Sequence, residues 1–140
     1  MNMKEFLLNV YEGIYFIAKK YETQPSKLTI NGRFFATFLS YHFSLVTILI
    51  GIFVLIYGPF KLSLPVALFL LFGLFGLIYW YLLYPHRNTG EIDENMEEAL
   101  VKKKKRIALY VQVGGIISIA LAVTIIYFLY KIFDPKSMAR

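Results

Sequence analysis

The chain of 140 residues contains no cysteine. Without cysteine it forms no disulfide, offers no thiol nucleophile and binds no metal through thiolates, and its redox compartment cannot be read from the sequence. Histidine is also scarce, since only His42 and His86 occur. Two histidines without paired acids are a poor metal site and a poor catalytic pair. The sequence therefore predicts a non-catalytic protein with no cofactor and no metal.

Charged side chains are missing from three long runs, residues 34–57, 62–84 and 107–130. Each run is longer than the roughly 20 helical residues that cross about 30 Å of hydrocarbon. The composition agrees, because 58% of the residues are hydrophobic and 18% are aromatic, whereas a soluble domain is roughly 45–50% apolar. The sequence predicts an all-α, polytopic membrane protein with three transmembrane helices.

Turn and breaker residues divide the chain around these spans. Gly58-Pro59 ends the first span, Ser63 caps the second with Pro65 in its first turn, and Pro85 stops the second. The predicted segments are a cytoplasmic amphipathic helix and linker at 1–33, transmembrane helices at 34–57, 64–84 and 107–130, a short outer loop at 58–63, a cytoplasmic charged loop or helix extension at 85–106, and an outer tail at 131–140.

Further signals concern the beginnings of the first and third spans. The linker Glu22–Ser26 indicates a break because it contains Pro25, and Asn31-Gly32 indicates a second turn before the first span. Neither glycine nor proline occurs from Glu91 to Val113, so nothing in that stretch interrupts a helix. The third helix is therefore predicted to begin near Asp93 and to extend into the cytoplasm.

Lysine and arginine are distributed unevenly between the two sides of the predicted membrane. Eleven lie in the N-terminal segment and the second loop, and four lie in the first loop and the C-terminal tail. The positive-inside rule then places the N-terminus and the second loop inside and the C-terminus outside. The predicted location is a bacterial inner (cytoplasmic) membrane or an organellar inner membrane.

The N-terminal segment has the pattern of an amphipathic helix. Its apolar residues recur at steps of three and four, and its polar residues lie mostly opposite them. The apolar face comprises Met3, Leu7, Val10, Ile14, Ile17 and Tyr21, and the polar face comprises Glu5, Asn9, Glu12, Gly13, Lys19 and Lys20. Such a helix either lies in the membrane interface or docks on the protein's own cytoplasmic surface or on a partner.

Small and hydroxyl residues form a stripe on the first span and another on the third. The first consists of Thr37, Ser40, Ser44, Thr47 and Gly51, and the second of Gly114, Ser118 and Ala122, with Gly115 at its edge. This spacing is typical of close helix packing in membranes. The two stripes pack against each other, or one of them joins separate chains. The alternative is that several copies assemble and the hydroxyl stripe lines a pore.

His42 lies on the side of its helix opposite the hydroxyl stripe. An ionisable residue within a span is a functional candidate. We interpret His42 and Tyr41 as part of the aromatic belt at the cytoplasmic boundary. The alternative is an intramembrane polar pair between His42 and Gln112, which enters the third span from the same side.

Five consecutive basic residues directly precede the third span, namely Lys102, Lys103, Lys104, Lys105 and Arg106. Consecutive residues point all around a helix, so they form a collar. We interpret this collar as a topology signal and an anchor for anionic lipid headgroups. No fold module supports nucleic-acid binding, so the predicted partners are membrane lipids and no nucleic acid.

These features together predict an accessory or scaffolding helix-bundle subunit of a membrane complex. Its partners are other membrane subunits or copies of itself. The alternative function is a self-assembling small channel or pore-forming effector. A lipid-modifying enzyme is a third class, but it needs a nucleophile with a base, or metal ligands, at the interface, and the sequence offers none at convincing spacing.

Overall fold

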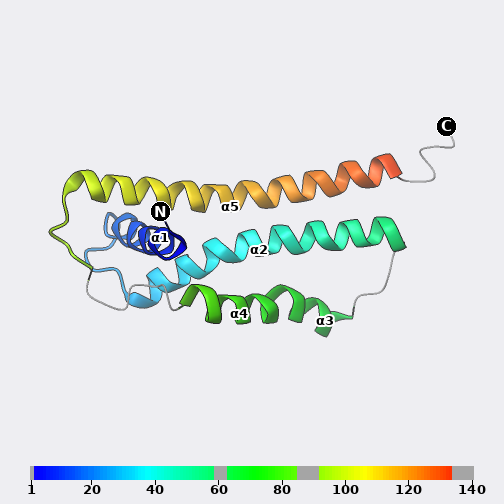
Figure 1. Ribbon diagram of the computed structural model, residues 1–140, viewed down its shortest axis with the longest axis horizontal. Helices are drawn as coiled ribbons and strands as arrows, with labels where there is room; N and C mark the ends of the chain where they lie inside the picture. The colour runs from blue at the N-terminus through cyan, green and yellow to red at the C-terminus, as the bar shows by residue number, and fades with distance from the viewer. Residues whose placement is uncertain (1, 59–62, 85–91, 134–140) are drawn as a thin grey trace.

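The computed structural model describes residues 2–58, 63–84 and 92–133, and all the regular structure in these ranges is helical. Three helices are long and apolar enough to cross a membrane: Lys27–Tyr57, Leu64–Leu83 and Glu98–Ile132. They run lengthwise beside one another, and the N-terminal helix lies across one end (Figure 1). The predicted all-α class, with three apolar helices preceded by an N-terminal helix, is confirmed.

The first long helix, α2 (Lys27–Tyr57), begins earlier than predicted. Ser26 caps it, because the Ser26 hydroxyl accepts a hydrogen bond from the Thr29 N–H at 3.1 Å. The predicted turn at Asn31-Gly32 is wrong, since both residues lie inside α2. Tertiary contact overrides the local signal there: the Asn31 side chain accepts a hydrogen bond from the Tyr11 hydroxyl at 2.8 Å.

The other end of α2 agrees with the sequence. Gly58 adopts φ +83, a left-handed conformation that a glycine reaches without steric cost. Its N–H donates to the Val54 carbonyl at 2.9 Å. The predicted termination of the first span at Gly58 is confirmed.

The second span is one helical rod with two wider turns. It comprises α3 (Leu64–Leu68), the π-helical turn η1 (Phe69–Gly73), α4 (Leu74–Ile78) and the π-helical turn η2 (Tyr79–Leu83). Ser63 occupies the predicted N-cap position and Pro65 the first turn, although the Ser63 side chain makes no capping hydrogen bond to a described residue. Pro85 lies outside the described residues.

The third long helix, α5 (Glu98–Phe133), has 36 residues. Its predicted beginning near Asp93 is wrong, because residues 93–97 are not helical. The Asp93 carboxylate instead accepts the Asn95 N–H at 2.9 Å, which favours a local turn over a helix. Of the predicted outer tail at 131–140, residues 131–133 belong to α5 and residues 134–140 lie outside the described residues.

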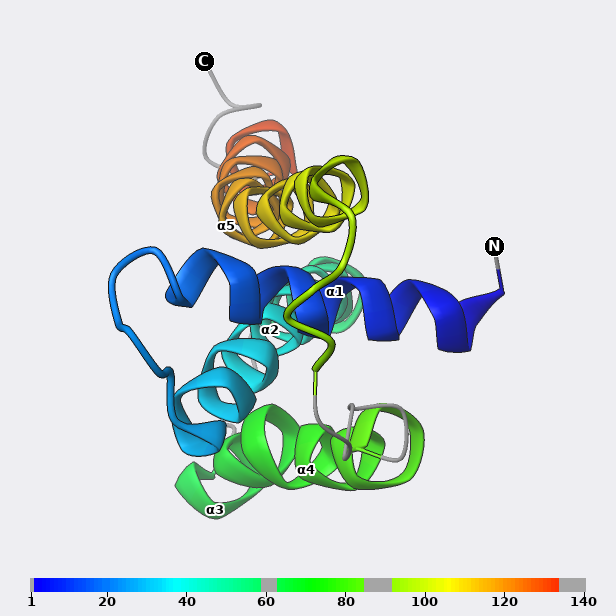
Figure 2. The same cartoon turned by 90° about the vertical axis from the view of Figure 1, so that its left-hand side faces the viewer.

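The N-terminal helix α1 (Met3–Ala18) packs on α2 and α5. Seen from that end, it runs across the bundle, with α5 above it and the second span below (Figure 2). Here lies the main core, in which Val10, Ile14, Phe34 and Ala108 are fully buried. Elsewhere the spans are mostly uncovered, since only 11–22% of each apolar window is buried within the chain. Such surfaces require lipid or other subunits around them.

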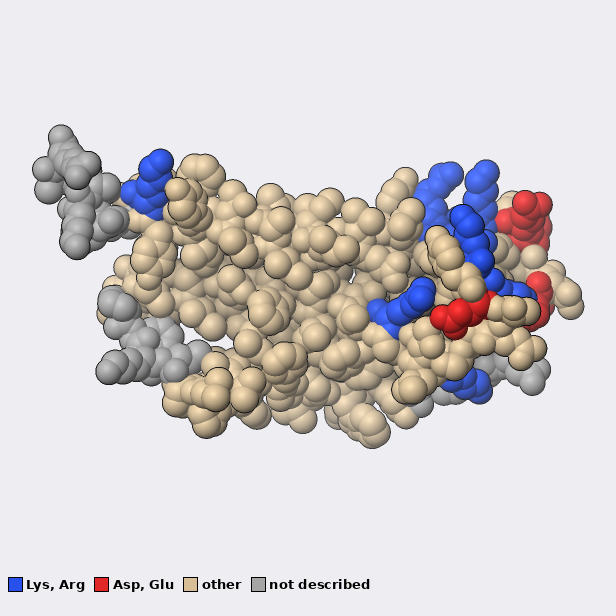
Figure 3. Space-filling view, turned by 180° about the vertical axis from the view of Figure 1, so that it is seen from behind, with Lys and Arg blue, Asp and Glu red and all other residues tan. Residues whose placement is uncertain are grey.

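Charged residues gather around α1 and the beginning of α5, as the space-filling view shows (Figure 3). We call this part of the molecule the charged end. Within the described residues, the opposite end of α5 carries one basic residue in its last turn, Lys131. The long middle of the molecule between these ends is uncharged in the same view.

Candidate functional site

The docking of α1 on α5 depends on a close backbone approach at Gly13. A Cβ atom added to Gly13 would lie 2.3 Å from the Lys104 carbonyl oxygen and 2.7 Å from the Ala108 Cβ. Glycine is therefore required here, because any side chain would push the two helices apart. Glu12 and Gly13, which the sequence places on the polar face of this helix, are both buried against α5.

Glu12 and Lys104 form a buried ion pair across this interface. Their side chains are 8% and 10% exposed. Lys104, which we interpreted as a headgroup anchor, is buried, and its ammonium group donates to the Glu12 carboxylate. Replacing Glu12 alone would leave the Lys104 charge buried without its ion-pair partner, so the pair favours one position of α1 on α5.

A second polar contact joins α1 to the segment before α5. The Glu94 carboxylate accepts a hydrogen bond from the Tyr15 hydroxyl and lies 2.9 Å from the Lys19 ammonium group. The bond to Glu94, followed by burial and the negative charge of that carboxylate, raises the pKa of Tyr15 to about 12. The bonds from Lys19 and Tyr15 lower the pKa of Glu94. These three residues hold the 92–97 segment against α1.

The hydroxyl and small-residue stripes meet in one seam between α2 and α5. The Ser44 and Ser118 hydroxyl groups are 2.8 Å apart and hydrogen bonded, although the residues are 74 positions apart. Thr37, Ser44 and Ala122 are buried, and Ser40 and Thr47 are half-buried. The Tyr41 hydroxyl donates to the Val111 carbonyl at 2.7 Å and closes the seam on the side of the charged end.

Glycines bring the two helices together along this seam. A Cβ on Gly51 would lie 1.7 Å from Ile126 Cδ1, and one on Gly114 would lie 2.5 Å from the Tyr41 hydroxyl oxygen. Gly115 is confined as well, because an added Cβ would lie 2.1 Å from Ser40 Oγ and 3.3 Å from the Thr37 carbonyl oxygen. The two stripes therefore pack against each other within one chain.

His42 and Gln112 do not meet. His42 Nε2 lies 2.9 Å from the Leu70 carbonyl oxygen of the second span, and its ring packs on Phe75 with centroids 5.3 Å apart. The reason is geometric: the hydroxyl stripe faces α5, so the opposite side of α2 has to face the second span. A carbonyl only accepts, so Nε2 carries the proton.

Gln112 lines a separate hollow between α2 and α5. The hollow has a volume of about 320 Å³ and is also lined by Arg33, Thr37 and Ser40. It lies on the side of α2 away from His42, since Thr37 and Ser40 belong to the seam. The sequence predicted neither Arg33 nor this grouping.

Comparisons with known proteins add no assignment. Family models, curated proteins and solved structures all yielded no match to this chain. Among the residues that the structure describes, no group of three or more His, Asp or Glu side chains could hold a metal ion. Any account of function therefore rests on the geometry of the chain itself.

Sequence reasoning missed the Glu12–Lys104 and Tyr15–Glu94–Lys19 contacts. One signal was present: Glu12 and Gly13 stand between the buried residues Tyr11 and Ile14. A glycine beside an acid within an apolar helix indicates close backbone approach and a buried partner. The identity of that partner could not be read, because the collar offers four lysines and one arginine as candidates.

Proposed function

We propose that the protein is a non-catalytic integral membrane protein that acts as an accessory or scaffolding subunit of a membrane complex. The observation that carries this proposal is the division of its surfaces. The polar seam is satisfied inside the chain, while one large apolar helix surface stays uncovered. On α5 this surface includes residues that are 43–69% exposed, namely Leu109, Val113, Ile116, Ile117, Leu121, Val123, Ile125 and Phe128.

A subunit of this kind holds other chains rather than transforming a substrate. Its spans supply apolar contact area to lipid and to neighbouring helices. Its charged end carries a helix docked across the bundle, and the exposed residues of that helix include Lys4 and Glu5. The uneven distribution of lysine and arginine supports placing the charged end in the cytoplasm, with the C-terminus outside.

The arrangement of the seam weighs against the channel alternative. A pore lined by the hydroxyl stripe needs Ser44 and its neighbours to face water between chains. In the structure Ser44 bonds Ser118, and Gly51 is covered by Ile126. Opening such a pore would require α2 and α5 of the same chain to separate first.

The native mass of the protein, extracted with a mild detergent from its own source membrane, tests the proposal. We expect a complex that contains other membrane proteins at a fixed ratio. A homogeneous ring of identical chains that leaks ions from liposomes would favour the channel. A monomer of 16.3 kDa without companions would overturn both functions. Engineered single cysteines for crosslinking are unambiguous in a chain without native cysteine.

A further inference from the structure

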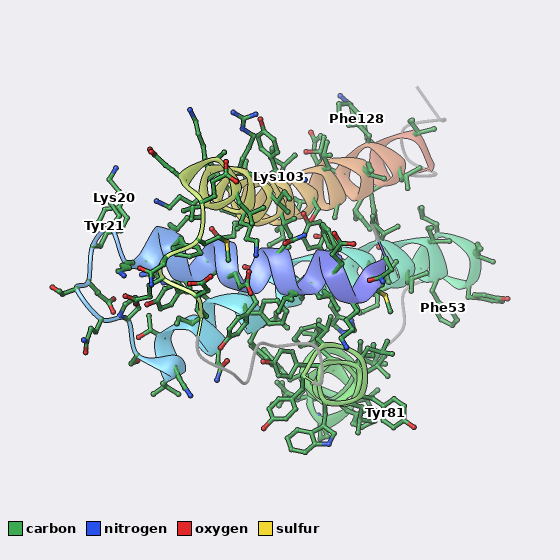
Figure 4. The ribbon with its side chains drawn as sticks, turned by 60° about the vertical axis from the view of Figure 1, so that its left-hand side comes forward. Lys20, Tyr21, Phe53, Tyr81, Lys103 and Phe128 are labelled. Atoms are coloured by element: carbon green, nitrogen blue, oxygen red, sulfur yellow. The ribbon has the colours of Figure 1, made fainter. Side chains whose placement is uncertain are left out.

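A groove of about 410 Å³ opens to the surface between α1 and α5 at the charged end. Four basic side chains line it: Lys20 from the end of α1, and Lys102, Lys105 and Arg106 from α5. Figure 4 shows Lys20 and Tyr21 together just beyond the C-terminal end of α1, with Lys103 on α5 apart from them. Lys103 is not among the lining residues.

The basic residues before the third span are therefore not an even collar. At 3.6 residues per turn, Lys102, Lys105 and Arg106 share an arc of about 100° on α5. Lys104 points the other way and pairs with Glu12. Helical geometry thus directs three of the five cations into the groove, and the docking of α1 adds Lys20 as a fourth.

This positive charge is not balanced inside the groove. No aspartate or glutamate is among the described residues that line it. Two acids of the charged end are engaged elsewhere, Glu12 with Lys104 and Glu94 with Lys19 and Tyr15. A concave surface lined by one sign of charge concentrates the field and attracts an anion.

The rest of the groove is apolar and aromatic. Its remaining lining residues are Phe16, Ile17, Tyr21, Leu109 and Tyr110, of which Leu109 and Tyr110 are 50% and 67% exposed. From Lys102 to Tyr110 the groove follows α5 for about 12 Å. It passes from the charged end into the first residues of the apolar run at position 107. Cations at one end and bare apolar side chains at the other match a phospholipid at the membrane boundary.

We propose that this groove binds one anionic phospholipid. Lys20, Lys102, Lys105 and Arg106 contact its phosphate, and Leu109 and Tyr110 contact the first part of its acyl chains. The inference rests on the membrane placement in the proposed function and on no protein partner. The lipid joins α1 to α5 and so strengthens the docking that Glu12 and Lys104 specify.

The test uses the purified full-length protein in phosphatidylcholine nanodiscs and measures the binding of fluorescent phosphatidylglycerol. The groove variant is Lys20→Gln with Lys105→Gln. The matched control is Lys4→Gln with Lys103→Gln, which removes the same charge from exposed positions outside the groove. A second groove variant, Lys102→Gln with Arg106→Gln, checks the result independently, and circular dichroism in phosphatidylcholine alone verifies folding.

We expect each groove variant to bind phosphatidylglycerol about 30-fold more weakly, for two lost cations at the membrane surface. The control should lose less than about threefold, since its cations lie outside the groove. Equal losses in all variants would show a diffuse attraction to the whole collar and overturn the site. Unchanged binding in the groove variants would overturn it too.

Inorganic phosphate, added to the same assay, separates a lipid site from a simple anion site. We expect it to displace the lipid only at concentrations more than about 100-fold higher, because it lacks the acyl contacts. Displacement at equal concentration would overturn the acyl part of the proposal. These measurements use the isolated protein, so failure to find partner subunits would count only against the subunit function.

Discussion

The Glu12 carboxylate of α1 and the Lys104 ammonium of α5 form a buried ion pair between residues 92 positions apart. The pair lies next to Gly13, where the backbones of α1 and α5 approach closely. Hydrophobic contact alone would let α1 slide or rotate on the bundle, because it is non-directional. A charge pair beside a glycine contact permits one position, so α1 is a fixed part of the fold.

Breaking this ion pair is expected to release α1. Glu12→Gln leaves the Lys104 charge buried and should destabilise the docked state by about 3 kcal/mol. The measurement is hydrogen exchange of the α1 amides in nanodiscs, which should become much faster while α2 amides stay protected. Glu5→Gln is the matched control, because Glu5 is exposed.

The double variant Glu12→Leu with Lys104→Met distinguishes the charge from the shape. Two apolar side chains of similar volume should restore much of the lost protection. Fast exchange in the double variant would mean that the ion pair contributes more than the avoidance of an unpaired charge.

Two glycines in helices should respond oppositely to alanine. Gly13→Ala forces a methyl group against the Lys104 backbone, which cannot rotate away, and should cost about 2 kcal/mol of α1 docking. Gly32→Ala meets nothing within 4 Å inside α2 and should raise stability by about 0.5–1 kcal/mol. Thermal unfolding in detergent, combined with exchange of α1, measures both. A tolerated Gly13→Ala would contradict the close approach.

The seam between α2 and α5 is expected to reject a larger residue at Ser44. Ser44→Leu replaces a buried hydroxyl that bonds Ser118 and should destabilise the helix pair by about 1–3 kcal/mol. Thr124→Leu is the control, because Thr124 is exposed on α5 and bonds only the Ala120 carbonyl of its own helix in the described structure. Crosslinking between engineered cysteines on α2 and α5 reports the separation. Equal crosslinking in both variants would argue against the seam.

His42 is expected to stabilise the second span and not α5. His42→Leu removes the hydrogen bond to the Leu70 carbonyl and should lower stability by about 1 kcal/mol. Gln112→Leu should change stability by less than about 0.5 kcal/mol, because Gln112 lines an open hollow. Thermal melting of both variants in the same detergent decides between the two pairings. A larger loss of stability for Gln112→Leu than for His42→Leu would instead favour the predicted pair between His42 and Gln112.

The contact of Tyr15 and Lys19 with Glu94 should be lost both at low pH and at high pH. The Glu94 pKa is lowered in the folded state, so its contribution is present above the ordinary value of 4.5 and is lost as pH falls through the lowered value. The Tyr15 pKa is raised to about 12, so its contribution is complete below pH 10 and is lost as pH rises from 10 to about 12.

A spin label at Asn95→Cys measures whether the 92–97 segment stays against α1. We expect low mobility between these limits and increased mobility at low pH. Tyr15→Phe removes the titrating hydroxyl and should leave the acid transition in place. Constant mobility from pH 3 to 8 would contradict the role of Glu94 in holding the segment.

The local sequence pattern was sufficient to predict the helices, because charged side chains are costly in lipid and the three apolar runs contain none. A run without charge that is longer than 20 residues has few alternatives to a spanning helix. The end at Gly58 and the break at Glu22–Ser26 followed from backbone preferences of single residues. The 3.6-residue period also placed His42 on the side of the helix opposite the stripe that contains Ser44. In the structure Ser44 faces α5 and His42 faces the second span.

Local pattern failed where a distant residue supplied the missing interaction. Asn31-Gly32 has the preferences of a turn, yet Tyr11 bonds Asn31 within α2. Asp93 has the preferences of a helix N-terminus, yet residues 93–97 are not helical. They form a local turn in which Asp93 accepts the Asn95 N–H, and Glu94 contacts Lys19 next to α1.

The amino-acid sequence by itself determined that the protein has three apolar helices, an amphipathic helix before them and a cluster of basic residues at one end. The partner of each polar residue depends instead on the packing of α1 across α2 and α5. This packing buries Lys104 and forms the groove lined by Lys102, Lys105 and Arg106. The contact of α2 with α5 in turn leaves His42 on the side of α2 that meets Leu70. The physical reason is that periodicity defines the face of a helix, whereas the neighbour of that face is set by contacts between distant parts of the chain.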